Sequence, residues 1–151
     1  PEAIAIDFHD GRGGRELVSY GELRARVARV AGALAAAGFV PGDALAIDMP
    51  MTARAVEIYL GIVWAGLTVV SIADSMAAEE IATRLRIADA RAVFTAFAID
   101  RGGKRLPLYE KVVAAGAPRA IVLDAPADAL RPGDLGWEAF LALGAGASPP
   151  A

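Results

Sequence analysis

The sequence predicts an α/β protein, with a mainly parallel sheet flanked by helices on both faces and preceded by an N-terminal β-hairpin. Short β-compatible runs alternate with helical runs of about 8 to 18 residues, which is the pattern of βα units. The chain has 151 residues, of which 56% are hydrophobic, so it can bury one sizeable core. Residues 67–73 form a β-branched run that is typical of a strand buried in a parallel sheet.

The first elements follow from turn and capping signals. Residues 3–8 and 16–19 are β-compatible and flank a glycine-rich stretch, which predicts the hairpin. Ser19 can cap a helix that follows, and Glu22 stands at the spacing of a capping box. Apolar residues then recur at helical spacing until Gly38, which favours a helix end there.

The rest of the chain continues the alternation. Residues 44–49 form a strand, Thr52 can cap the next helix, and Gly66 can end it. After the strand at 67–73, we expect a helix at 77–88, a strand at 92–96, a helix at 108–115, a strand at 120–123 and a short helix at 135–143. Glu79 and Glu80 fall in the first turn of a helix, where carboxylates favour the helix dipole, so we interpret them as structural.

Composition excludes several classes of function. A formal net charge of −3 gives no field that would attract nucleic acid or a membrane surface. The absence of cysteine rules out disulfides, thiolate metal sites and a cysteine nucleophile, and is compatible with the cytoplasm. His9 is the single histidine and has no apparent catalytic partner. The apolar stretch at 58–72 is too short to span a membrane, and we interpret it as a buried helix followed by a buried strand. We expect a cytoplasmic protein.

Two glycine-containing stretches are candidates for a phosphate site. GRGG at 11–14 lies in the expected hairpin turn, without a helix N-terminus to follow, so we interpret it as a turn. DRGGKRLPL at 100–108 places Arg101, Lys104 and Arg105 around two glycines. Its spacing differs from that of a Walker loop, but it follows a strand, and ligands of open α/β sheets collect at the carboxyl ends of strands. The residues alone leave two interpretations, a local anion site and a solvated charged loop.

Four stretches together resemble the N-terminal region of the AMP-forming acyl-CoA synthetases, a branch of the adenylate-forming superfamily. They are SYGEL at 19–23, GFVPGDALAIDMP at 38–50, GIVWAGLTVVSI at 61–72 and RIADARAVFT at 86–95. SIADSMAAEEIATRL and RGGKRLPLYEKV further resemble segments of the acetyl-CoA synthetase members. The resemblance implies the N-terminal subdomain of the acyl-CoA synthetase fold for residues 1–143, and residues 144–151 resemble a linker toward a catalytic subdomain.

The resemblance implies a ligase reaction in two steps. A carboxylate attacks the α-phosphate of ATP to give an acyl-adenylate and pyrophosphate, and the thiolate of coenzyme A then displaces AMP. The segments of the family that grip pyrophosphate and Mg²⁺ have no counterpart in this sequence, which also starts at Pro1 rather than at methionine. We therefore expect a fragment that is inactive alone and binds none of ATP, Mg²⁺ and coenzyme A by itself.

The resemblance also implies contacts to the nucleotide end of coenzyme A. In the acetyl-CoA synthetase branch these contacts fall on positions that match Arg101 and Lys104, and on a segment that matches Asp74, Ser75 and Met76. The family has small glycines in that segment. Because a carboxylate repels a pyrophosphate, we expect Asp74 to point away from it.

Two other hypotheses remain open. One is a stand-alone α/β module that binds a nucleotide or a protein without catalysis, and the other is an unrelated doubly wound nucleotide-binding domain. The fragment hypothesis adds an expectation of its own. An apolar face that the full enzyme buries would be exposed, so we expect the chain to self-associate through that face.

Overall fold

A five-stranded parallel sheet with the strand order β4-β3-β5-β8-β9 forms the centre of the protein. The structure is a computed structural model and describes residues 2–146. The sheet strands are β3 (Ala44–Asp48), β4 (Thr68–Ile72), β5 (Ala90–Ala96), β8 (Ala120–Leu123) and β9 (Leu135–Gly136). Two antiparallel hairpins stand outside the sheet, β1 (Ile4–His9) with β2 (Arg15–Ser19), and β6 (Ile99–Arg101) with β7 (Lys104–Leu106). Of the expected linker at 144–151, residues 147–151 lie outside the described residues.

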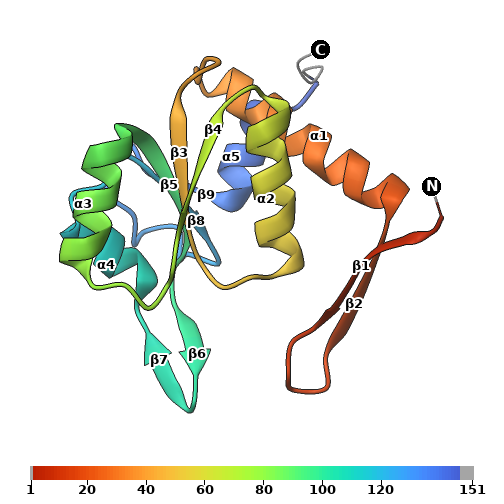
Figure 1. Cartoon of the computed structure of the whole chain (residues 1–151), viewed down its shortest axis with the longest axis horizontal. Helices are drawn as coiled ribbons and strands as arrows, with labels where there is room; N and C mark the ends of the chain where they lie inside the picture. The colour runs from red at the N-terminus through yellow and green to blue at the C-terminus, as the bar shows by residue number, and fades with distance from the viewer. Residues whose placement is uncertain (1, 147–151) are drawn as a thin grey trace.

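Helices cover both faces of the sheet, as predicted (Figure 1). On one face lie α1 (Tyr20–Ala36), α2 (Ala53–Trp64) and α5 (Trp137–Leu143), and on the other lie α3 (Ala78–Ala88) and α4 (Leu108–Ala114). Strand alternation divides the core between them, since Leu45 packs with the first set of helices and its neighbour Ala46 with the second. Phe94 meets Phe140 edge to face, with ring centroids 5.4 Å apart, and this contact fixes α5 on the sheet.

The capping signals in the sequence are confirmed. The backbone N–H of Glu22 donates to the Ser19 hydroxyl at 3.1 Å, and the backbone N–H of Ser19 donates to the Glu22 carboxylate at 2.9 Å. The Thr52 hydroxyl accepts from the backbone N–H of Ala55, which caps α2. Gly38 follows α1 with a φ of 94°, a conformation that glycine adopts without strain.

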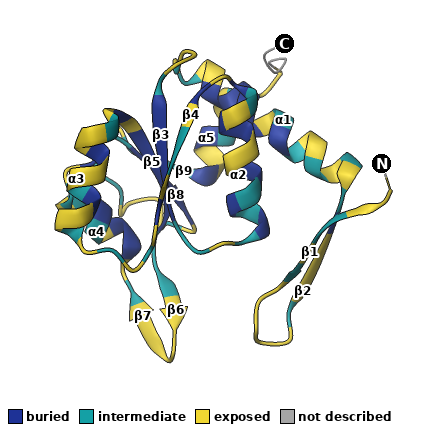
Figure 2. Ribbon diagram, in the orientation of Figure 1, coloured by how far each residue is buried: buried dark blue, intermediate teal, exposed yellow. Residues whose placement is uncertain are grey.

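Three expectations about elements are wrong in detail. The strand at 67–73, expected to be buried, is β4 at the edge of the sheet, and Ile72 is the one residue of Thr68–Ile72 that is buried (Figure 2). The expected loop at 100–108 contains the β6–β7 hairpin. The expected helix at 135–143 begins two residues later, because Leu135 and Gly136 add a fifth strand to the sheet beside β8.

Candidate functional site

The carboxyl ends of the parallel strands lie at one edge of the sheet, which is where open α/β sheets bind ligands. The segment 73–77 leaves β4 at this edge, and the segment 97–107 leaves β5 and contains the β6–β7 hairpin. All five residues that the resemblance assigns to coenzyme A lie in these two segments. They come from positions about thirty residues apart in the chain, and the sheet brings two of them into contact.

Asp74 and Arg101 form a two-pronged ion pair. The Arg101 guanidinium donates from Nη1 to Asp74 Oδ1 at 2.9 Å and from Nη2 to Oδ2 at 2.7 Å. The Asp74 side chain is 11% exposed and that of Arg101 is 50% exposed. Hydrogen bonds from Arg101 lower the pKa of Asp74, against the opposing effect of burial. The carboxylate is therefore ionised at neutral pH and orients the guanidinium. The surface formed by Asp74, Arg101 and the neighbouring Lys104 is called the rim below.

Lys104 lies opposite Arg101 across the β6–β7 hairpin. The two residues are paired in the register, and Gly102 and Gly103 form the turn between them with φ values of 58° and 78°. Such a two-residue turn with both φ values positive favours glycine at both positions. The hairpin therefore presents two exposed cationic side chains beside each other. Neither interpretation of the sequence, an anion cradle or an irregular loop, included this regular element.

Ser75 and Met76 follow Asp74 in the turn that leads to α3. Ser75 is exposed, whereas Met76 is half-buried and packs against the core beneath α3 and α4. The backbone N–H of Met76 donates to the Ala73 carbonyl at 3.0 Å, which closes the turn. The segment thus presents Asp74 and Ser75 to the rim and turns Met76 inward.

A buried acid and a lysine lie beneath this rim. Asp48, at the end of β3, is fully buried, and neither carboxylate oxygen has a hydrogen-bond partner among the described residues. Burial raises its pKa to about 6; the charge of Lys111 acts to lower it and that of Asp74 acts to raise it. Lys111 donates from Nζ to the Asp74 backbone carbonyl at 2.7 Å. Lys111 therefore ties α4 to the turn that carries Asp74.

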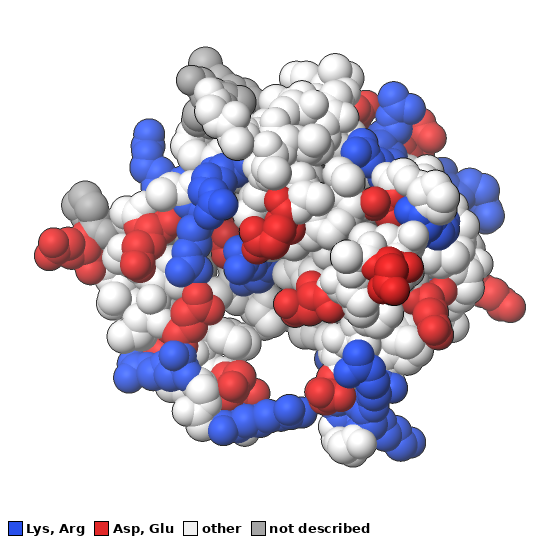
Figure 3. Space-filling model, turned by 180° about the vertical axis from the view of Figure 1, so that it is seen from behind, with Lys and Arg blue, Asp and Glu red and all other residues white. Residues whose placement is uncertain are grey.

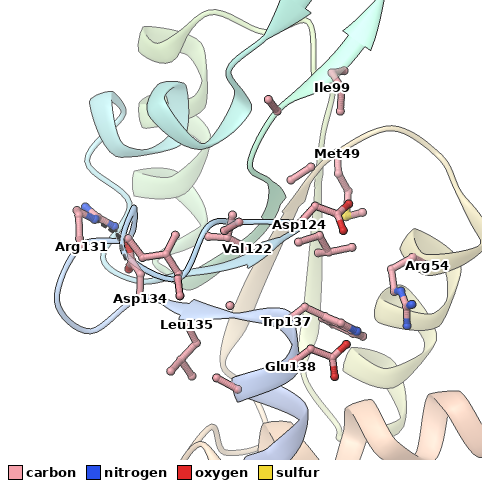
Figure 4. A pocket seen from close by; sticks show the side chains of 18 of the residues that line it. Met49, Arg54, Ile99, Val122, Asp124, Arg131, Asp134, Leu135, Trp137 and Glu138 are labelled. Atoms are coloured by element: carbon pink, nitrogen blue, oxygen red, sulfur yellow. Dashed lines mark hydrogen bonds and ion pairs between the residues drawn. The ribbon is translucent and has the colours of Figure 1, made fainter.

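A hollow opens at the same edge of the sheet, with a volume of about 900 Å³ (Figure 4). Its lining includes Met49 after β3, Asp124 after β8 and Trp137 at the start of α5. The Arg54 guanidinium lies 4.9 Å from the centre of the Trp137 ring, in cation–π geometry. None of the five residues assigned to coenzyme A lines this hollow, so the two features are separate parts of the edge.

A polar network around Asp134 stabilises the wall of the hollow that residues 130–134 form. The Asp134 carboxylate accepts from the Tyr109 hydroxyl at 2.7 Å, from the Arg131 side chain at 2.8 Å and from the backbone N–H of Ala120 at 2.8 Å. Burial opposes ionisation of Asp134, but these hydrogen bonds outweigh it and lower its pKa. The network attaches the segment 124–134 to α4 and β8, and its Arg131–Asp134 contact is drawn in Figure 4.

Charges of both signs are interspersed over the face seen in Figure 3. Within residues 2–146, no group of three or more His, Cys, Asp or Glu side chains is arranged to hold a metal ion. Among the helices that the structure describes, none has the length and apolar character needed to cross a membrane.

The AMP-binding enzyme family matches residues 1–139 of the sequence. The chain belongs to this family. Hexanoyl-CoA synthase from Cannabis sativa is 52% identical over 124 residues, which are 80% of this chain and 17% of that protein. The probable acyl-activating enzyme 18, peroxisomal, from Arabidopsis thaliana has the same identity and coverage. An acetyl-coenzyme A synthetase from Streptomyces avermitilis is 33% identical over 103 residues, which are 68% of this chain and 16% of that protein.

These relatives confirm the family that the sequence resembles. The chain spans less than a fifth of the length of each of these three relatives. The solved structure of acetoacetyl-CoA synthetase from Streptomyces lividans matches the whole chain with a TM-score of 0.83 at 24% identity, and the match covers 23% of that structure's chain. The match confirms the predicted fold.

Two residues near the site, Asp48 and Lys111, were not predicted from the sequence. Asp48 carried a signal, since it is the one acidic residue of an otherwise apolar strand, ALAID. Lys111 carried none, because a lysine in a short amphipathic helix is usually solvated. Its contact with Asp74 depends on how α4 lies against the β4–α3 turn, and no local pattern encodes that placement.

Proposed function

We propose that this chain is the N-terminal subdomain, residues 1–143, of an AMP-forming acyl-CoA synthetase. Such an enzyme uses ATP to convert a carboxylic acid into an acyl-adenylate, releasing pyrophosphate, and the thiolate of coenzyme A then takes the acyl group and releases AMP. The observation that carries the proposal is the family match over residues 1–139, supported by relatives whose names include acyl-CoA and acetyl-coenzyme A synthetases. We further propose that residues 144–151 lead toward the catalytic part.

Within that enzyme, we propose that Arg101 and Lys104 contact the phosphates at the nucleotide end of coenzyme A. The two cations face each other across a regular hairpin, at the carboxyl edge of the sheet, where open α/β sheets bind ligands. The Asp74 carboxylate accepts from one N–H of each terminal nitrogen of Arg101, so the remaining N–H groups stay available for phosphate oxygens. Ser75 adds an exposed hydroxyl beside them, whereas the inward position of Met76 favours a packing role.

No residue of this chain is assigned as a ligand of Mg²⁺, and the described residues hold no group of three or more His, Cys, Asp or Glu side chains arranged around a metal ion. ATP likewise has no assigned contact here. We propose that both bind the longer protein. We also propose a cytoplasmic location, with which the cysteine-free sequence is compatible. A fluorescent fusion of the full-length protein tests it, and import into an organelle would contradict it.

The reading frame that encodes the chain gives the first test of the proposed activity. We expect a Ser/Thr/Gly-rich stretch ending in Pro-Lys soon after Ala151. The full-length protein should then form AMP and an acyl-CoA from ATP, Mg²⁺, coenzyme A and a carboxylic acid, assayed over acids of increasing chain length. The 151-residue chain alone serves as the control and should form neither product. A stop codon directly after Ala151, or a full-length protein that forms no AMP with any acid, would contradict the proposal.

A further inference from the structure

Strand β4 presents an unpaired edge of the central sheet. Within the described residues it forms ladder hydrogen bonds only with β3. The backbone N–H of Thr68 donates to the Asp43 carbonyl at 2.9 Å, so strand alternation turns the backbone groups of Val69 and Ser71 outward. Exposed edges are usually protected by charges, proline or a bulge, and residues 67–73 contain none of these. The edge is therefore a template for another strand.

Exposed apolar side chains flank this edge on both faces of the sheet. On the α2 side, Tyr59, Leu60 and Val63 are exposed, and a hollow of about 330 Å³ lies between α2 and β4. On the α3 side, a groove of about 520 Å³ runs between Val70 and Ile87, whose side chain is 79% exposed. An added strand would therefore find apolar contacts for the side chains on both of its faces.

We propose that this edge pairs with β4 of a second copy of the chain, antiparallel and about a two-fold axis at Val70. In that register Val70 lies opposite the partner's Val70, and Val69 lies opposite the partner's Ser71. Because the backbone groups of Val69 and Ser71 point outward in both copies, the pairing forms four N–H···O=C bonds. The two five-stranded sheets become one continuous sheet across the dimer.

The flanking charges favour a second copy as the occupant. The groove on the α3 side is lined by Glu80 and Arg84, one helical turn apart. In the proposed dimer the two α3 helices run antiparallel, and we place Glu80 of each copy opposite the partner's Arg84, so that both charges gain an opposite partner. On the other face the α2 surface meets its own copy through the exposed apolar side chains of Tyr59, Leu60 and Val63. The surface is thus complementary to itself. This inference does not depend on the proposed activity.

Sedimentation of the 151-residue chain at micromolar concentrations tests the pairing. We expect a species of twice the 15.5 kDa chain mass. Ser71→Pro removes an outward N–H, at a position where an edge strand tolerates proline, and should raise the dissociation constant by roughly tenfold or more. Ser71→Thr keeps the N–H and should leave the dimer intact. Circular dichroism of each variant separates loss of pairing from loss of fold.

A cysteine cross-link tests the register independently of Ser71. The chain has no cysteine, and facing residues of a non-hydrogen-bonded antiparallel pair have Cα atoms close enough for a disulfide. With oxidised glutathione as the oxidant, Val70→Cys should yield a disulfide-linked dimer. The control Leu17→Cys, at an exposed position of strand β2, should cross-link several-fold more slowly.

Charge reversal tests the contact between the α3 helices. Glu80→Arg alone and Arg84→Glu alone should each weaken the dimer, and the double variant should restore it. A chain that stays monomeric at every concentration would overturn the proposal, and it is the result expected if a strand from a longer polypeptide occupies the edge. A dimer that Ser71→Pro leaves intact, and that Val70→Cys does not cross-link faster than the control, would overturn it as well.

Discussion

Asp74 and Lys111 together fix the position of Arg101 before any ligand binds. Asp74 accepts two hydrogen bonds from the guanidinium, and Lys111 donates a hydrogen bond to the backbone carbonyl of Asp74. The cost of this arrangement is a negative charge close to the proposed phosphate contact. Because Asp74 offsets the charge of Arg101, we infer that Lys104 supplies the net positive charge of the site.

Asp48 makes a pH-dependent contribution to stability. Its pKa is about 6 in the folded chain, against an ordinary value of 3.8. Between these values the unfolded chain has lost the Asp48 proton and the folded chain keeps it, so this group's contribution to the free energy of unfolding falls as the pH rises from about 4 to about 6. Above pH 6 the loss is complete, and it amounts to roughly 2 to 3 kcal/mol.

Asp48→Asn tests this contribution, because an amide does not titrate. Urea unfolding of both proteins at several pH values between 4 and 7.5 is the measurement. The stability of the variant relative to the wild type should rise with pH, and the difference should change by about 2 to 3 kcal/mol across the range. Any constant cost of the amide cancels in this comparison. Parallel stability curves for the two proteins would show that Asp48 does not titrate with a raised pKa.

At the residue scale, contacts between residues close in the sequence could be predicted, whereas contacts between distant residues could not. Ser19 and Glu22 were predictable as a capping box because their partners lie three residues apart. The hydrogen bonds between Asp74 and Arg101 span 27 residues, so they depend on which strands are neighbours in the sheet. The family resemblance pointed to both residues, but nothing in the sequence showed that they contact each other.

At the scale of elements, the packing of α1 on α2 depends on Gly61. A Cβ atom added there would overlap the Val30 side chain of α1. We expect Gly61→Ala to lower the free energy of unfolding, because overpacking of a tight contact costs about 1 to 3 kcal/mol and outweighs the better helix propensity of alanine.

The matched control is Gly136→Ala, at a glycine whose added Cβ would have no atom within 4 Å. Its cost should stay at or below about 1 kcal/mol, which is what a change at a helix N-cap brings. Thermal or urea unfolding of the two variants beside the wild type is the measurement. Equal stability of Gly61→Ala and the wild type would mean that the two helices move apart without cost.

The type of most elements could be predicted from hydrophobic periodicity, but which elements lie next to each other in the sheet could not. The alternation of strands and helices was correctly predicted from hydrophobic spacing, which depends on local sequence. The β6–β7 hairpin was missed because its strands have three residues each, too few to show a period. The run TVVSI reads as a buried strand whether it lies inside a sheet or at its edge, so its position in β4 was not predictable.

At the scale of the whole molecule, two separate features share the carboxyl edge of one sheet. The Asp74–Arg101–Lys104 rim lies on the segments after β4 and β5, and the large hollow lies among the segments after β3, β5 and β8. The free edge of β4 is a third surface, flanked by α2 and α3. The order of the strands in the sheet determines this division, and the family resemblance covered only the first of the three features.

The proposed binding of the nucleotide end of coenzyme A at this rim is tested by kinetics of the full-length protein with Arg101→Ala. The KM for coenzyme A should rise by roughly tenfold or more, while acid-dependent exchange of pyrophosphate into ATP stays nearly unchanged. Arg105→Ala, in the same hairpin but with no assigned contact, is the matched control and should change neither value. An equal loss in the exchange reaction and in acyl transfer would contradict a role for Arg101 in binding coenzyme A.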